Sequence, residues 1–129
     1  MPYKTMWYKP DRVAYLELLG EFSLEEMVES SEAIRDQYLE VGTSPVHLVC
    51  DLRGLSGHSR DLRAARRAAE IYLNHPSMGW VIVIGMDSPI VKFLLSIISQ
   101  MTQTDVKTVQ SLEEVDMVLR RIDGSLAQT

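Results

Sequence analysis

The order of hydrophobic and polar positions along the chain first predicts the strands. Near the amino terminus, apolar and polar residues alternate on both sides of a Lys9-Pro10-Asp11 turn, a pattern typical of a β-hairpin. Two later runs are apolar without alternation, as in strands that are covered on both faces of a sheet. The expected strands are 3–8, 12–19, 46–52, 79–86 and 106–109. We expect 79–86, the most hydrophobic of them, to be central.

Between and after these strands, apolar residues recur at the spacing of helices. Ser23 with Glu26, and Ser111 with Glu114, form capping boxes that mark the starts of two helices. Ser88 followed by Pro89 marks the start of another. The expected helices are 24–41, 61–73, 90–101 and 112–122, the last with Leu112, Val115, Val118, Leu119 and Ile122 on its inner face.

The elements therefore follow the order ββαβαβαβα, with five strands and four helices. Helices of this length between apolar strands act as crossovers, so the sheet should be mostly parallel, with the opening hairpin antiparallel. We expect a single α/β domain over residues 1–129, with 125–129 as a flexible tail. A chain of 129 residues is long enough to bury a sizeable core.

Composition and charge narrow the classes of function. A net charge of −5 and an isoelectric point near 5.1 argue against nucleic-acid or anionic-membrane binding, which need a basic surface. The single cysteine, Cys50, lies in an apolar run and is expected to be buried and unreactive. No segment reaches the roughly 20 apolar residues of a membrane span, so we expect a cytoplasmic protein without a transmembrane segment. The histidines lack metal-ligand spacing, and we expect neither a metal nor a cofactor.

The segment Leu48-Val49-Cys50-Asp51-Leu52-Arg53-Gly54-Leu55 is similar to the apolar strand ending in Asp-Leu-Ser-Gly-Val of STAS domains, the sulfate-transporter and anti-sigma-factor-antagonist family. The order of elements resembles that family and its SpoIIAA-like relatives over nearly the whole chain. In typical members a serine at the start of the next helix is phosphorylated by a partner kinase. Here that position carries Arg60 or Asp61, so the resemblance implies a regulatory, protein-binding domain without the usual phosphate acceptor.

Polar residues gather where the strand 46–52 ends and the basic helix 61–73 begins. Ligands and partners of open α/β sheets bind beyond the carboxyl ends of strands, so we predict a partner- or anion-binding edge there. The candidate residues are Arg53, Ser56, His58, Ser59, Arg60 and Arg63. Two ordinary interpretations stay open: the serines as helix caps, and the arginines as a solvated helix face.

An enzymatic interpretation of the same edge is the weaker alternative. It would use His58 with Asp51, but Cys50 and Asp51 point to opposite faces of one strand, and the spacing defines no catalytic triad. We therefore expect a non-catalytic protein.

The predicted helix 90–101 is apolar almost all round. Such a helix is either buried on several sides or offers an apolar surface to a partner. The candidate interface residues are Phe93, Leu94, Ile97, Ile98 and Met101. A protein partner or self-association as a dimer is the first hypothesis. The second is a small apolar or lipid-like ligand bound between this helix and the sheet.

Overall fold

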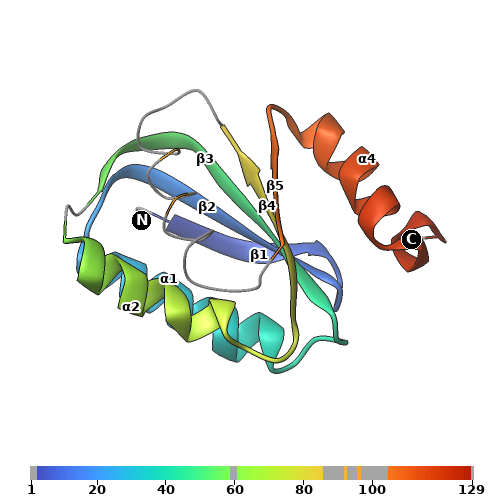
Figure 1. Cartoon of the computed structure of the whole chain (residues 1–129), viewed down its shortest axis with the longest axis horizontal. Helices are drawn as coiled ribbons and strands as arrows, with labels where there is room; N and C mark the ends of the chain where they lie inside the picture. The colour runs from blue at the N-terminus through green and yellow to red at the C-terminus, as the bar shows by residue number, and fades with distance from the viewer. Residues whose placement is uncertain (1–2, 59–60, 86–91, 93–95, 97–104, 129) are drawn as a thin grey trace.

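The computed structural model describes residues 3–58, 61–85, 92, 96 and 105–128, which form one five-stranded sheet with helices on its two faces (Figure 1). The strand order is β1-β2-β3-β4-β5; β1 and β2 are antiparallel and the other neighbours are parallel. The strands are β1 Tyr3–Lys9, β2 Val13–Phe22, β3 Val46–His58, β4 Met78–Ile84 and β5 Val106–Val109. The predicted fold class is confirmed, but β3 rather than β4 is the middle strand.

The helices begin at the predicted capping residues in two cases. Ser23 and Glu26 form a full capping box, and the Ser111 hydroxyl accepts from the Glu114 amide. The helices are α1 Leu24–Ile34, α2 Leu62–Leu73 and α4 Leu112–Ile122, with a π-helical turn η1 Arg35–Leu39 and a 3₁₀ turn η2 Gly124–Gln128. Of the predicted helix 90–101, only Lys92 and Ser96 lie within the described residues, and both are helical.

The handedness of the crossovers decides which helices share a face. The connections from β2 to β3 and from β3 to β4 step the same way across the sheet, and right-handed crossovers place both helices on one face. Figure 1 shows α1 and α2 together on one side and α4 on the other. Each face has its own apolar core, and β3 contributes Leu48 to one and Val49 to the other. This strand is therefore covered on both faces, as predicted.

Two expectations about α4 and the chain end need correction. Leu112, expected on the inner face of α4, is exposed, whereas Val115 and Leu119 are buried. The end of the chain, expected to be a flexible tail from residue 125, continues as η2 through Gln128. Leu126 is buried in the same core as α4, and that contact holds η2 against the sheet.

The largest difference from prediction is the length of β3. The strand expected over 46–52 does not end at Leu52 but stays extended to His58 and pairs with the end of β2, from Leu19↔Gly54 to Phe22↔His58. Gly54 fits this pairing because a Cβ atom there would lie 2.7 Å from the Leu19 Cδ2 atom. We call these paired segments, 19–22 and 53–58, the β2–β3 extension.

Candidate functional site

Alternate residues of β3 point to the face covered by α4 and form two polar clusters separated by the buried Val49. At the start of the strand, His47 contacts the residues that follow α4. Further along, Asp51 and Arg53 bind each other where β3 leaves β4. The two clusters therefore lie at opposite ends of the sheet.

Asp51 is the centre of the cluster at the carboxyl end of the sheet. Its side chain is only 2% exposed, whereas that of Arg53 is 47% exposed. The Arg53 Nε and Nη2 atoms donate to the two carboxylate oxygens at 3.0 and 2.8 Å, and the Arg53 amide donates at 3.1 Å. The Tyr15 hydroxyl of β2 donates to the same carboxylate. We call Tyr15, Asp51 and Arg53 the Asp51 cluster.

Charge and burial act in opposite directions on Asp51. Burial by itself raises the pKa of this carboxyl, but hydrogen bonds from Arg53 and Tyr15 more than offset it, so the net pKa is lowered. The carboxylate in turn raises the pKa of Arg53. A forked, charge-assisted pair of this kind fixes the guanidinium plane. Arg53 is thus held in one orientation, with part of its side chain in solvent.

The Asp51 cluster is connected to α4 through stacked tyrosines. The rings of Tyr8 and Tyr15 stack with centroids 6.2 Å apart, and the Tyr8 hydroxyl donates to Asp116 Oδ1 at 2.9 Å. Burial, followed by the bond to Asp116, raises the pKa of Tyr8 to about 12. The stacked rings therefore tie β1, β2 and α4 together beside Asp51.

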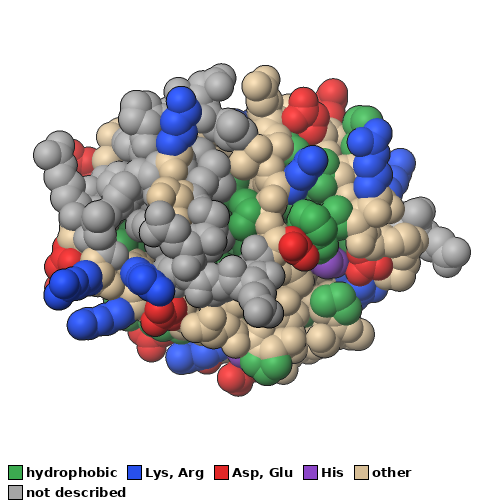
Figure 2. All heavy atoms as spheres, viewed as in Figure 1, with side chains coloured by type: hydrophobic (Ala, Val, Ile, Leu, Met, Phe, Trp, Pro, Cys, Tyr) green, Lys and Arg blue, Asp and Glu red, His purple; other side chains and the backbone are tan. Residues whose placement is uncertain are grey.

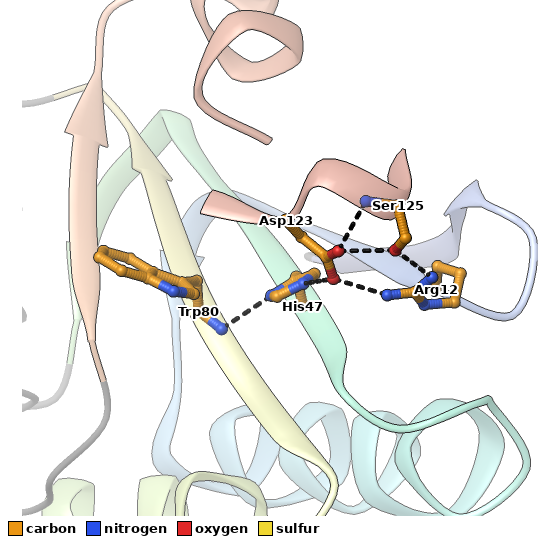
Figure 3. A network of polar contacts seen from close by, with 5 residues as sticks. All are labelled: Arg12, His47, Trp80, Asp123 and Ser125. Atoms are coloured by element: carbon orange, nitrogen blue, oxygen red, sulfur yellow. Dashed lines mark hydrogen bonds and ion pairs between the residues drawn. The ribbon is translucent and has the colours of Figure 1, made fainter. Parts of the chain in front are cut away.

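The second cluster, at the opposite end of the sheet, is centred on Asp123 (Figure 3). Asp123 Oδ2 accepts from Arg12 Nη2 at 2.6 Å and contacts His47 Nε2 at 3.0 Å. Its Oδ1 atom accepts from the Ser125 amide and hydroxyl at 3.1 and 2.6 Å. Arg12 Nη1 also donates to Ser125 Oγ at 2.8 Å. We call these residues, with the Trp80 amide, the Asp123 clasp, because they fasten the end of the chain to the sheet.

A β-bulge explains why His47 belongs to the clasp. The register between β3 and β4 shifts between Val46↔Met78 and Leu48↔Val81, so two residues of β4 lie opposite His47. The Trp80 amide in this bulge donates to His47 Nδ1 at 2.9 Å. Because an amide can only donate, Nδ1 must be unprotonated, and the ring's Nε2–H donates to Asp123. The contacts thus define one neutral tautomer of His47.

The clasp contains the residue types of a hydrolase triad but not its geometry. The Ser125 hydroxyl donates to Asp123, not to His47, and both ring nitrogens of His47 already have partners. A triad needs a base aimed at the nucleophile. Cys50 is also unsuited to catalysis, because burial raises its pKa to about 12. Within the part of the chain that the structure describes, no group of acidic, histidine or cysteine side chains can hold a metal ion.

The predicted binding residues fall partly inside the described chain. Arg53 and Ser56 are exposed on the β2–β3 extension, His58 ends β3, and Arg63 is exposed in the first turn of α2. Ser59, Arg60, Phe93, Leu94, Ile97, Ile98 and Met101 lie outside the described residues. The cap of α2 is Asp61, whose carboxylate accepts from the Ala64 amide at 3.1 Å, so the expected serine cap is wrong there. Because this carboxylate already accepts the hydrogen bond of the Ala64 amide, that amide is not available to a bound anion.

Sequence reasoning missed Tyr15, Arg12 and Asp123 as members of polar clusters. The signal for the Asp51 cluster is the alternation of His47, Val49, Asp51 and Arg53, which places them on one face. Asp123 gave no such signal, because its partners Arg12 and His47 are 111 and 76 residues away in the chain.

The Asp123 clasp should weaken in acid. Hydrogen bonds from Ser125 and His47, and the charge of Arg12, lower the pKa of Asp123 from 3.8 to about 2. Because the folded-state value lies below the unfolded one, the stabilisation is complete above about pH 4 and is lost as the pH falls through about 2. We expect the difference in urea unfolding free energy between wild type and Asp123→Asn, at most about 2 kcal/mol, to shrink over this interval. A difference that stays constant from pH 6 to about 2 would contradict this assignment.

Comparisons with known proteins define the class of fold. The sequence matches no protein-family model and no curated protein. Among solved structures, an uncharacterised DUF3478-family protein with a SpoIIAA-like fold from Shewanella loihica PV-4 is similar over 94% of this chain and 92% of its own, with 15% identity and a TM-score of 0.63. The anti-sigma factor antagonist SpoIIAA in its unphosphorylated form is 14% identical over 92% and 97% of the two chains, with a TM-score of 0.52.

The Bacillus cell fate determinant SpoIIAA in its phosphorylated form is similar as well. It is 13% identical over 90% of this chain and 98% of its own, with a TM-score of 0.58. The chain therefore has the SpoIIAA-like fold, as the sequence resemblance predicted. No helix within the described part of the chain is long and apolar enough to cross a membrane.

Proposed function

We propose that this chain is a non-catalytic regulatory module that binds a protein partner at the β2–β3 extension. The observation that carries the proposal is the extension itself. The pairing of β2 with β1 ends at Leu18, and the pairing of β3 with β4 ends at Asp51. Beyond these residues, β2 and β3 pair only with each other among the described strands. A two-stranded ribbon of this kind presents backbone and side chains to an incoming surface.

The side chains of the extension suit recognition rather than chemistry. Glu21, Arg53 and Ser56 are exposed, and Arg53 is held in place by Asp51 before any partner arrives. A cation that is already oriented loses little freedom on binding, so it favours a partner with carboxylate or phosphate groups. By contrast, the nucleophiles and bases of both polar clusters are occupied by one another.

The fold comparisons agree with this role without naming a partner. Two of the similar structures are of SpoIIAA, which is named as an anti-sigma factor antagonist and as a cell fate determinant. Both names describe a regulatory role for SpoIIAA. A cytoplasmic location, expected from the sequence, stays a prediction.

Site-specific photo-cross-linking in the organism that encodes the protein tests the proposal. A photoreactive amino acid replaces Ser56 on the extension, and the control replaces Val41, which is 64% exposed and precedes the other end of β3. We expect a discrete adduct from position 56 that is several-fold weaker from position 41, and that forms again with the purified partner. Equal adducts at both positions, or none at 56, would contradict the proposal.

A further inference from the structure

The structure also points to a second surface, on α4: we propose that the outer face of this helix binds the same face of a second copy of the chain. The inner face of α4 is occupied by Val115 and Leu119, which are buried in the core. Met117 is 55% exposed on the opposite side. Around it lie four exposed charged residues, Glu113, Glu114, Arg120 and Arg121. We call these five residues the α4 face.

The charges of the α4 face are arranged symmetrically about Met117. Glu113 and Arg121 are each four residues from it, and Glu114 and Arg120 are each three residues from it. At about 100° per residue, the first two lie about 40° to either side of Met117 around the helix axis, and the other two about 60°. Acidic residues precede Met117 and basic residues follow it. When the order of residues about Met117 is reversed, each charge is therefore matched by one of opposite sign.

This symmetry fits an antiparallel contact about a two-fold axis. With Met117 of both copies on the axis, the two-fold rotation reverses the order along the helix but keeps the side of the helix, so Glu113 of each copy lies opposite Arg120 of the other, and Glu114 opposite Arg121. The contact then contains four ion pairs around an apolar centre, and both copies use the same surface, as an isologous interface requires. Space-filling atoms show acidic side chains at the top of the molecule, where α4 begins, and basic ones further to the right (Figure 2).

The charged groups are available for such pairing. Glu113, Arg120 and Arg121 form no ion pair with another described residue, whereas Glu114 uses one oxygen to accept from the Gln110 amide at 2.8 Å. The helix dipole by itself favours acidic residues in the first turn and basic residues in the last. It does not account for a half-exposed methionine at the midpoint between them. A self-complementary pattern favours a second copy over an unrelated partner.

The size of the surface sets the expected strength. One helix pair buries much less than the roughly 1,600 Å² of a standard stable interface, so the dimer should be weak, with a dissociation constant in the micromolar to millimolar range. Ion pairs at its rim are screened by salt, so association should weaken as ionic strength rises. Assembly would then depend on local concentration, and it does not depend on the β2–β3 extension.

Charge reversal tests the proposal with two variants. Each is predicted to self-associate poorly by itself, and a mixture of the two is predicted to associate. Glu113→Arg and Arg120→Glu each place like charges across the axis, so each should weaken self-association at least tenfold in sedimentation experiments on the full chain at up to about 1 mM. An equimolar mixture restores opposite charges at both contacts and should associate about as tightly as wild type. Circular dichroism checks that each variant is folded.

A second pair of variants separates the α4 face from the rest of the surface. Met117→Lys should abolish association, whereas Met6→Lys, at a methionine that is 50% exposed on β1, should leave it unchanged. A wild-type chain that stays monomeric at about 1 mM in low salt, or a mixture that associates no better than its components, would overturn the proposal.

Discussion

Replacing Asp51 with alanine is expected to lower the free energy of unfolding by about 3 kcal/mol, because it leaves buried donors without an acceptor. The carboxylate accepts from the Tyr15 hydroxyl, the Arg53 guanidinium and the Arg53 amide. Arg53 can turn to water, since nearly half of its side chain is exposed, but the buried Tyr15 hydroxyl cannot. Urea denaturation at pH 7 measures the loss.

Three further variants show whether the Asp51 cluster causes the effect. Tyr15→Phe removes one donor and leaves the ion pair, so it should cost about 1 kcal/mol. Arg53→Ala removes the compensating charge from a buried carboxylate and should cost more than Tyr15→Phe. Asp105→Ala removes an exposed aspartate and should change stability by less than about 0.5 kcal/mol. If Asp51→Ala is no more destabilising than Asp105→Ala, the cluster does not stabilise the fold.

The sequence predicted the strands and their order because local patterns determine them. Continuous apolar runs mark strands that are buried on two faces, and β3 and β4 are such strands. The caps at Ser23 and Ser111 depend on residues only three positions apart, so they can be read without tertiary structure.

The errors arise where tertiary contacts override local preference. Gly54 and Gly57 favour a loop by composition, yet pairing with β2 keeps this segment extended. The strand 79–86 is the most hydrophobic but is second from the edge of the sheet. Its hydrophobicity indicates that both of its faces are covered by other parts of the protein, and it does not indicate how many strands lie on each side of it.

The same reason limited the prediction of the polar clusters. Arg53 was identified because it follows an apolar strand, where a sheet edge is expected. Nothing in the sequence pattern singles out Asp123 or His47 as a member of a polar cluster. Their contact requires the end of α4 to return to the start of β3, which no spacing in the sequence encodes. The predicted interface on helix 90–101 stays a prediction.

The bulge in β4 makes a further prediction about the Asp123 clasp. A Cβ atom at Gly79 would lie 2.5 Å from His47 Nδ1 and 2.8 Å from Cε1, closer than nonbonded atoms can approach. His47 is buried, and its ring is held between the Trp80 amide and Asp123, so it cannot turn aside without losing both bonds. Glycine is thus required at this position by the closeness of the ring rather than by backbone conformation.

Gly79→Ala should therefore lower the free energy of unfolding by about 2–4 kcal/mol, through displacement of His47 and the unpaired buried groups that this leaves. Gly57→Ala is the matched control in a neighbouring strand, because among the described residues a Cβ there meets only the Glu21 Cγ atom, at 3.5 Å. Nitrogen chemical shifts of His47 should report the Nε2–H tautomer in wild type and a changed ring environment in Gly79→Ala. A Gly79→Ala protein with wild-type stability and unchanged His47 shifts would show that the ring does not bind the Trp80 amide.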